Sequence, residues 1–438
     1  MSQAEKWGWH TLGQREECSC GEVHELPIEA CYVDAGAARE LAEFARGRGC
    51  RRAFVISDEN TREADGEQLL SLLGVNHLAI DEKIYPGSGL EATQERADEV
   101  AAAGAEADVY VAIGAGTISD LAKSAGSKQG KPVLLYPTAA SMNGYTSAIV
   151  ALKVNGLKRT LPCAPATGIF ANPEVVATAP QLMVAAGVAD FLSKCSSACD
   201  WQAAHMLRGG YYCRRPREFN EGIQERLFAE SLAIGRGEPE GIKLVLEALL
   251  LSGFGMVMAG SSAPASGGEH LISHYLDMKH ALYGSSNDLH GVQVGVSTVY
   301  TLGLWEKVLS LSVDAIDIDA LVAAQPREEE IQEIIQEDWG DKVGAEVRSQ
   351  WAEKRLTEKA LREELAKFRE MLPKLRARLG EDLQPASFVA RCIEECGGPS
   401  RPEDMAASTK EFKKGLKRAR YLRNRFTILD LAAETGVA

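Results

Sequence analysis

The chain has 438 residues, of which 45% are hydrophobic, and this length predicts two or three domains with substantial cores. Its 62 acidic and 48 basic residues give a formal net charge of −14 at pH 7, which disfavours nucleic acid and anionic membranes as partners. No stretch approaches the roughly 20 uninterrupted apolar residues of a membrane span, and residues 1–9 are too polar for a secretory signal. Because the ten cysteines are scattered, we expect reduced thiols and a cytoplasmic protein.

The first third of the chain alternates short apolar runs with helical stretches. In chain order, the pattern predicts a strand at 53–57, a helix at 67–73, a short strand at 78–80, a helix at 92–103, a buried strand at 109–113 and a strand at 131–136. Strands separated by helices indicate right-handed βαβ units. The sequence therefore predicts an α/β domain with a mostly parallel, doubly wound sheet.

After about residue 175 the pattern changes to long helical periodicities with few strand candidates. A charge-rich stretch at about 327–383 carries apolar residues at helical spacing and predicts exposed amphipathic helices. We therefore expect an α/β domain over 1–175 and an all-α domain over 176–438.

A glycine-containing turn follows the predicted strand at 109–113. Gly114, Ala115, Gly116 and Thr117 open a helix that also carries Asp120. Small residues at a strand-to-helix turn let backbone N–H groups approach a pyrophosphate, and the helix N-terminus adds partial positive charge. The spacing is not G-x-G-x-x-G, and a purely structural tight turn remains the alternative.

A second polar loop, PTAASMNGYTS at 137–147, follows the next predicted strand. It carries Thr138, Ser141 and Ser147. Open α/β sheets bind ligands in the crevice at the carboxyl ends of their strands, so both loops are expected to meet there. An ordinary Ser/Thr-rich loop remains the alternative.

A third constellation combines Asp190 with His270, His274 and His290. Four of the eight histidines lie between residues 270 and 290, and His270 and His274 share one face if that segment is helical. A carboxylate with two imidazoles suits Zn, Fe(II), Ni or Co and leaves coordination positions open for an alkoxide. Histidines that serve only the core or the surface are the alternative.

Near the N-terminus, Cys18, Cys20 and His24 suggest a metal-binding knuckle. A structural zinc site needs four ligands, and the sequence offers no clear fourth one. Both a zinc site and a cluster without metal therefore remain open.

Six motifs carry a family resemblance: GAGTISD, PTAASMNGYTS, NGLKRTLPCAP, GVADFLSK, SGGEHLISHYLD and LHGVQVG. In this order they resemble the motifs of the sn-glycerol-1-phosphate dehydrogenase family. That family belongs to the superfamily of iron-containing alcohol dehydrogenases, glycerol dehydrogenases and dehydroquinate synthases. The similarity covers about residues 25–300, with a looser match in RARYLRNRFTILDLAAE. It implies a dehydroquinate synthase-like fold, with an NAD(P)-binding α/β domain, a helical metal- and substrate-binding domain, and a divalent metal in the cleft between them.

Carried over by position, the resemblance makes Asp190, His270 and His290 the metal ligands. It gives Asp190 and His274 catalytic roles and places His274 with Asn143 near the substrate. Cofactor contacts are implied for Gly114, Ala115, Gly116, Thr117, Ile118, Asp120, Thr138, Ser141 and Ser147, and for Asp58 at the adenosine ribose. A carboxylate at Asp58 would repel a 2′-phosphate, so NAD is favoured over NADP, which stays open.

The implied reaction interconverts sn-glycerol 1-phosphate, or a related small polyol phosphate, and dihydroxyacetone phosphate. One divalent metal (Zn, Ni or Fe) would act as a Lewis acid on the alcohol oxygen. Lys158, Arg159 and Lys194 are candidates for the substrate phosphate. We expect a homo-oligomer, although the sequence does not fix the number of subunits.

Two departures from the family pattern bear on these roles. Asn143 stands where the family usually has aspartate, which keeps the size but removes a charge. Ala115 replaces a glycine, which is tolerable if that residue has a negative φ.

Two alternative functions remain. A sugar-phosphate cyclase of the dehydroquinate synthase type would typically have glutamate at the position of Asp190. A non-catalytic nucleotide-binding protein would have no chemical need for the metal ligands.

Overall fold

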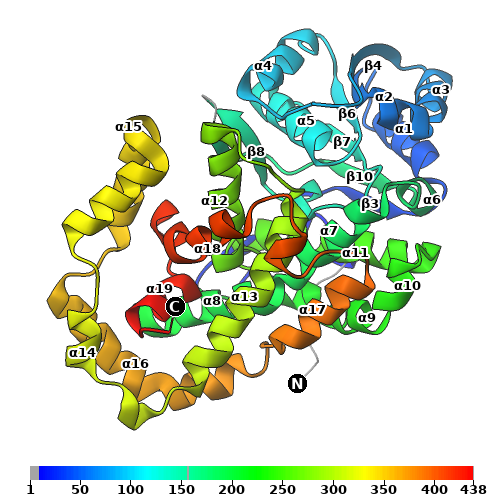
Figure 1. Cartoon of the computed structure of the whole chain (residues 1–438). Helices are drawn as coiled ribbons and strands as arrows, with labels where there is room; N and C mark the ends of the chain where they lie inside the picture. Colours follow the sequence, from blue (N-terminus) through cyan, green and yellow to red (C-terminus); the bar gives the residue numbers. More distant parts are fainter. Residues whose placement is uncertain (1–8, 155–156, 438) are drawn as a thin grey trace. The chain divides into compact units, whose positions relative to one another are not determined.

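The computed structural model describes residues 9–154 and 157–437, which form two compact units (Figure 1). The first unit consists of Met1–Phe191, Cys213–Ser262 and Glu395–Gly397. The second consists of Leu192–Tyr212, Ala263–Glu394 and Gly398–Ala438.

The first unit is built on a parallel six-stranded sheet in the order β3-β10-β7-β6-β4-β5. The strands are β3 (Ala30–Val33), β4 (Arg52–Asp58), β5 (Ala79–Tyr85), β6 (Val109–Ile113), β7 (Val133–Tyr136) and β10 (Gly168–Ala171). From β4 the chain adds β5 on one side and then returns to add β6 on the other. The strand order therefore reverses between β4 and β6, the position at which such sheets bind ligands.

Helices cover both faces of this sheet. On one face, alternate residues Val109, Val111 and Ile113 share a core with α1 (Ala37–Gly47) and α3 (Glu67–Val75). On the other face, the intervening Tyr110 donates its hydroxyl to the Ala101 carbonyl of α4 (Gln94–Ala103) at 3.2 Å. α5 (Gly116–Gln129) packs beside α4 (Figure 1). The predicted doubly wound α/β arrangement is confirmed.

The predicted elements differ from the observed ones mainly at the sheet edges. The predicted strand at 78–80 is too short, because β5 continues through exposed polar residues to the buried Tyr85. Strands β3 and β10 were missed, since each contributes only four residues to the sheet. Two antiparallel hairpins were also missed, β1–β2 (Arg15–Glu17 and Val23–Glu25) and β8–β9 (Ile149–Val154 and Leu157–Pro162).

The first unit also contains helices that follow the last strand of the sheet in the sequence. They are α6 (Pro173–Val176), α7 (Gln181–Leu192, as far as Phe191), α9 (Ile223–Ala229), α10 (Ser231–Gly235) and α11 (Pro239–Ala259). Thr146, in the loop after β7, donates its hydroxyl to the Leu250 carbonyl of α11 at 2.8 Å. A Cβ at Gly253 would lie only 1.9 Å from Thr146 Oγ1, so this glycine allows the close contact. The change from strands to helices near residue 175 is thus confirmed, whereas a domain boundary there stays a prediction.

The second unit contains helices and no strand among its described residues. The α-helices are α8 (Lys194–Arg208), α12 (Gly268–Tyr283), α13 (His290–Ser310), α14 (Ile318–Ala323), α15 (Glu328–Lys354), α16 (Glu358–Leu379), α17 (Ala386–Glu395, as far as Glu394), α18 (Thr409–Arg418) and α19 (Ile428–Glu434). The charge-rich stretch forms α15 and α16, as predicted. On α16 the apolar stripe of Phe368 and Leu372 is buried against Trp305 of α13 and Leu207 of α8.

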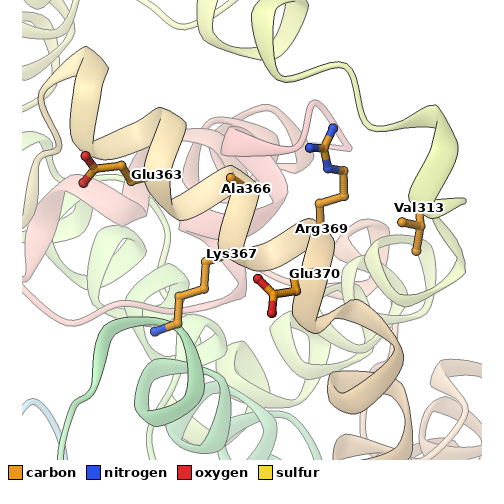
Figure 2. A pocket seen from close by; sticks show the side chains of 6 residues that line it. All are labelled: Val313, Glu363, Ala366, Lys367, Arg369 and Glu370. Carbon is orange, nitrogen blue, oxygen red and sulfur yellow. The ribbon is translucent and has the colours of Figure 1, made fainter.

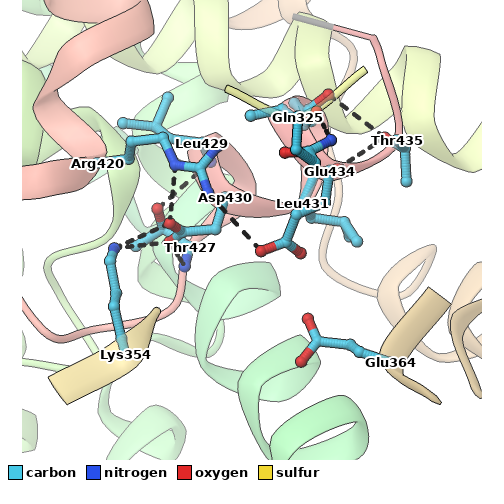
Figure 3. Close-up of polar contacts among 12 residues, drawn as sticks. Gln325, Lys354, Glu364, Arg420, Thr427, Leu429, Asp430, Leu431, Glu434 and Thr435 are labelled. Atoms are coloured by element: carbon cyan, nitrogen blue, oxygen red, sulfur yellow. Dashed lines mark hydrogen bonds and ion pairs between the residues drawn. The ribbon is translucent and has the colours of Figure 1, made fainter. Parts of the chain in front are cut away.

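A buried ionic network secures the C-terminal segment of the second unit (Figure 3). Asp430 of α19 pairs with Lys354 Nζ at 2.9 Å and with Arg420 Nε at 3.3 Å, and it accepts from the Thr427 backbone N–H at 3.0 Å. Burial alone would raise the pKa of Asp430, but Lys354 and Arg420 outweigh burial and lower it. Arg420 has a second acidic partner in Glu434 at 3.7 Å, whereas Asp430 is the carboxylate paired with Lys354, so losing Asp430 would leave the buried charge of Lys354 poorly compensated.

Two helical spans are long and apolar enough to cross a membrane by length and composition, Gln181–Arg208 and Pro239–Ala259. Charged residues interrupt both spans, so neither is the uninterrupted apolar run of about 20 residues that the sequence analysis considered. In their most apolar parts, 89% and 78% of the residues are buried inside the structure, as is usual for core helices.

Candidate active site

The glycine turn lies directly at the carboxyl end of the central strand β6. Ala115 is the N-terminal boundary residue of α5, with φ −87° and ψ −156°, so the condition under which alanine is tolerable at this position is met. A Cβ at Gly114 would lie 2.8 Å from Ile118 Cβ, which explains why a glycine is needed there. No side chain among the described residues caps this 14-residue helix, so its first N–H groups suit an anionic ligand.

Asp58 ends β4, the neighbour of β6 in the sheet. Its side chain accepts a hydrogen bond from the Thr61 backbone N–H at 2.9 Å and thereby caps the short helix α2 (Glu59–Thr61). The structure thus places Asp58 and Gly114 at the same edge of the sheet, on the two strands where the order reverses. The capping role is one that the sequence analysis did not predict.

Asp120 and Lys123 connect α5 to the second loop and to the strand β8 that follows it. Asp120 Oδ2 accepts from the Ala151 backbone N–H at 3.1 Å, and burial raises the pKa of Asp120 to about 6 although Lys123 opposes this. The buried Lys123 donates to the carbonyl oxygens of Gly144 and Ile149, both at 2.8 Å. Sequence reasoning missed Lys123. Its spacing could have indicated burial, because Ser119, four residues earlier, and Gly126, three residues later, put small residues on the same helix face.

The second loop contains the other predicted cofactor residues. Thr138 is buried and Ser141 is half-buried. Ser147 is buried, and its hydroxyl lies 3.0 Å from the Gly144 carbonyl and 3.2 Å from the Ile149 carbonyl. The Ser147 hydroxyl therefore shapes the loop itself.

Asp190 lies on α7 and is fixed to the same loop. Its carboxylate accepts from the Asn143 backbone N–H at 2.9 Å, and Asn143 Nδ2 lies 3.5 Å from the other carboxylate oxygen. A Cβ at Gly187 would lie 2.0 Å from the Ala140 carbonyl oxygen, so glycine at 187 lets α7 approach the loop. Asn143 and Asp190, predicted to be near the substrate, are thus brought together within the first unit.

In the second unit, three imidazoles gather at the start of α12 and α13. His270 lies in the first turn of α12, and His290 is the first residue of α13. Their ring centroids are 5.3 Å apart, and the centroid of His274 lies 6.3 Å from that of His290 with nearly parallel planes. The structure therefore brings the three predicted histidines together.

Hydrogen bonds fix which nitrogen each of two imidazoles offers. His270 Nδ1 lies 2.9 Å from Glu269 Oε1, which also accepts from the Gly267 backbone N–H at 2.6 Å. This oxygen is therefore the acceptor, and Nδ1 carries the proton. The Ser273 hydroxyl donates to Gln293 Oε1 at 2.6 Å and therefore accepts from His290 Nδ1 at 3.1 Å. Both histidines thus keep the Nε2 lone pair for a metal, as metal-binding histidines usually do.

The residues that orient these imidazoles were missed by sequence reasoning. Glu269 is fully buried and directly precedes His270, so its signal was an acidic residue adjacent to a candidate ligand. A second buried acid, Asp200 of α8, accepts from the backbone N–H groups of Gly268 at 2.7 Å and Ile428 at 2.8 Å. Burial and the charge of Glu269 raise the pKa of Asp200 well above its usual value.

The candidate phosphate-binding cations lie in different places. Lys158 and Arg159 are half-buried on β9, and Lys194 is buried in the first turn of α8.

A hollow elsewhere in the second unit, beside α16, is lined by Val313, Glu363, Ala366, Lys367, Arg369 and Glu370 (Figure 2). Two acidic and two basic side chains line it and point in different directions, which does not match an anionic substrate.

Comparison with known proteins places the chain among metal-dependent dehydrogenases. The family model for iron-containing alcohol dehydrogenase matches residues 32–180. Glycerol-1-phosphate dehydrogenase [NAD(P)+] of Halalkalibacterium halodurans is 33% identical over 297 residues, which cover 66% of this chain and 74% of that protein. The enzyme of the same name from Geobacillus stearothermophilus is 27% identical and covers 94% of both chains.

Solved structures share the fold. Glycerol dehydrogenase from Schizosaccharomyces pombe superposes with a TM-score of 0.54 at 16% identity, covering 81% of this chain and 92% of that chain. Sulfoacetaldehyde reductase from Bifidobacterium kashiwanohense, in complex with NAD+, gives a TM-score of 0.57 at 13% identity, covering 94% and 97% of the two chains. At these identities the likeness concerns the fold alone.

Proposed function

Because this chain belongs to the glycerol-1-phosphate dehydrogenase family and is a metal-dependent dehydrogenase that uses NAD(P), we propose that it interconverts sn-glycerol 1-phosphate and dihydroxyacetone phosphate. Because Asn143 stands where the family usually has aspartate near the substrate, a related small polyol phosphate is the alternative substrate. The observation that carries the proposal is the imidazole pair whose Nδ1 atoms are both engaged, which leaves two Nε2 lone pairs for a metal.

We propose that Asp190 joins His270 and His290 as the third metal ligand. One carboxylate and two imidazoles form a ligand set for Zn, Ni or Fe and leave positions open for the substrate oxygen. When bound, the metal supplies Lewis acidity at the substrate oxygen, and NAD(P) accepts or returns the hydride. Glu269 and Ser273 hold the two rings in the orientation that metal binding requires.

The cofactor would bind across the carboxyl ends of β4 and β6. In this proposal Gly114, Ala115, Gly116, Thr117 and Ile118 hold the pyrophosphate, with Asp120 behind them, while Thr138, Ser141 and Ser147 form the second side. Asp58 would accept a hydrogen bond from the adenosine ribose with the part of its carboxylate that does not cap α2. We expect NAD to serve at least as well as NADP, because this carboxylate repels a 2′-phosphate.

The substrate would lie beside Asn143 and Asp190. Asn143 offers an amide oxygen and an NH2 group to a substrate hydroxyl without adding negative charge beside a phosphate. His274 would carry the hydroxyl proton to solvent, because its ring stacks beside that of His290 and is half-exposed. Lys158, Arg159 and Lys194 are the proposed phosphate contacts. We further propose a cytoplasmic homo-oligomer.

A cyclase of the dehydroquinate synthase type is the second candidate. Aspartate rather than glutamate at 190 favours the dehydrogenase. The two differ in net cofactor use, since a cyclase returns its cofactor unchanged after each turnover.

The test follows NADH and NADPH oxidation with dihydroxyacetone phosphate in metal-loaded protein, together with the reverse reaction on glycerol 1-phosphate, glycerol 3-phosphate and glycerol. We expect turnover with the 1-phosphate, loss of activity and of the metal proposed at Asp190, His270 and His290 in His290→Ala, and retention of both in His280→Ala, which removes a histidine elsewhere on α12. Full metal occupancy in His290→Ala would refute that ligand. Activity confined to glycerol would refute the phosphorylated substrate.

A further inference from the structure

A second group of potential metal ligands lies in the first unit, around the β1–β2 hairpin. The connection between the two strands contains Cys18, Cys20 and Gly21, and Gly21 has φ +91°, which glycine adopts without strain. The Gly21 backbone N–H donates to the Cys18 carbonyl at 3.0 Å, which closes a tight turn. His24 follows on β2, and Cys20 Sγ lies 3.5 Å from His24 Nε2.

The structure supplies the fourth ligand that the sequence lacked. Cys213 is 195 residues away from Cys18 in the sequence, yet their Sγ atoms are 3.7 Å apart. Cys213 Sγ also lies 3.2 Å from His24 Nε2. The four donor atoms, three sulfurs and one nitrogen, all lie within 4.8 Å of one another.

These separations match a tetrahedral zinc site. Zn–S bonds of about 2.3 Å and a Zn–N bond of about 2.05 Å put sulfurs about 3.8 Å apart and sulfur and nitrogen about 3.6 Å apart. The observed 3.7 Å between sulfurs and 3.5 and 3.2 Å between sulfur and nitrogen lie close to these values. A disulfide would need about 2.05 Å between its sulfurs, and none of the ten cysteines, all within the described residues, is in one.

The histidine is oriented for coordination. His24 is 1% exposed, and its Nδ1 lies 2.9 Å from the carbonyl oxygen of Met258 in α11. A carbonyl oxygen only accepts, so Nδ1 carries the proton and the Nε2 lone pair faces Cys20 and Cys213. A backbone carbonyl holding the other ring nitrogen is the usual support of a metal-binding histidine.

We propose that Cys18, Cys20, His24 and Cys213 bind one structural Zn²⁺ ion, separate from the catalytic metal. Three thiolates and an imidazole complete a four-coordinate shell made only of protein, which leaves no position for a substrate. On binding, each coordinating thiol releases its proton to solvent and each sulfur donates an electron pair, with no change in oxidation state. Soft thiolates select zinc over the hard cations that prefer oxygen ligands.

The ion would fasten the N-terminal hairpin to the segment that begins at Cys213. Two other contacts run between the same parts of the first unit. Arg215 Nη2 pairs with Glu16 Oε1 at 3.1 Å, and the rings of Trp9 and Phe254 meet edge to face at 5.6 Å. The loop between Cys18 and Cys213 spans 195 residues, about as many as the 199 between Glu16 and Arg215. The zinc link differs from these contacts in the strength of its metal–ligand bonds, so it should raise the stability of this unit.

The first experiment measures zinc in reduced, dialysed protein by mass spectrometry of the metal, with His290→Ala present throughout to remove the catalytic metal. We expect one zinc per chain, which Cys213→Ser removes and Cys50→Ser keeps. Cys50 is a half-buried thiol outside the cluster and gives a matched control. No zinc bound by the reduced parent protein, even after titration with Zn²⁺, would overturn the proposal.

The second experiment replaces zinc with Co²⁺ and records the absorption spectrum. Thiolate-to-cobalt charge-transfer bands in the near ultraviolet should appear in the His290→Ala protein and weaken in Cys18→Ser, whose side chain lies at the accessible hairpin turn. This variant keeps the test decisive if Cys213→Ser fails to fold. Unchanged bands in Cys18→Ser, or a Cys18–Cys213 disulfide in the protein purified without reductant, would contradict the assignment. Neither outcome depends on dehydrogenase activity.

Discussion

Replacing Glu269 with glutamine should weaken metal binding without destabilising the protein. Glu269 Oε1 accepts from His270 Nδ1 at 2.9 Å and from the Gly267 backbone N–H at 2.6 Å. Glutamine keeps a carbonyl oxygen for both donors but removes the negative charge that makes the imidazole a stronger ligand. Loss of such a partner lowers metal affinity about 10- to 100-fold, which corresponds to about 1.4–2.8 kcal/mol.

The opposite effect is expected for stability, because Glu269 faces a like charge. A Cβ at Gly267 would lie 2.3 Å from Asp200 Oδ2 and 3.0 Å from Glu269 Oε2, so the two carboxylates share the space beside this residue. The charge of Glu269 contributes to the raised pKa of Asp200. Removing that charge relieves the repulsion, so the metal-free variant should melt at the same temperature as the parent or higher.

Two measurements distinguish an effect of Glu269 on the orientation of His270 from an effect on the stability of the protein. Protein that keeps the structural zinc but lacks the metal at His270 and His290 is titrated with Zn²⁺ in competition with a chromogenic chelator, and the thermal unfolding of the same samples is recorded. Glu337→Gln, which changes an exposed acid of α15, is the control and should alter neither result by much. Unchanged zinc affinity in Glu269→Gln, or a weaker affinity matched by an equal loss of stability, would refute the reasoning.

Three further changes test other parts of the structure. Lys123→Met should lower the free energy of unfolding by about 1.5–3 kcal/mol and weaken NAD binding, because two carbonyls lose a charged donor. Unfolding in urea measures the first effect and NAD titration the second. An unchanged NAD affinity would contradict the prediction. Asn143→Asp places a second carboxylate beside Asp190, so the melting temperature of the metal-free variant should be lower than that of the parent and should recover with saturating metal. A melting temperature that stays low with metal would argue against this. Burial, then Asp382, raises the pKa of Cys195 to about 12. The folded state therefore keeps this proton longer than the unfolded chain, and stability falls as pH rises above about 9. Cys195→Ala should melt with a shallower dependence between about pH 9 and about pH 11, and equal slopes would refute the effect.

The central strands could be predicted because their own residues carry the signal. VYVAI in β6 is buried along its whole length, as an internal parallel strand should be. The edges could not be predicted in the same way. AIDEKIY in β5 is mostly exposed and has three charged residues at its centre, and β3 consists of four half-buried residues. Such strands are defined by the neighbour they pair with, which local composition does not specify.

In the candidate site, too, some residues could be predicted from the sequence and others could not. His270 and His290 could be selected from sequence because histidines cluster there and the family motifs contain them. Residues that act on those ligands, such as Gln293 behind Ser273, are chemically ordinary and gain a role only through packing of α12 against α13. Cys213 is the extreme case, since its partner Cys18 is 195 residues away.

Three histidines in this protein are prepared for a metal by the same means, and their partners set the chemistry. His24 holds its Nδ1 proton on a backbone carbonyl, His270 on a carboxylate and His290 on a hydroxyl. An uncharged carbonyl suits an ion already neutralised by thiolates, whereas Glu269 adds negative charge behind His270, where the proposed ligand set contains only one carboxylate. The electrostatic support is therefore greatest at the site that must exchange substrate. We infer that replacing His24 would affect stability more than chemistry, whereas replacing Glu269 would affect chemistry more than stability.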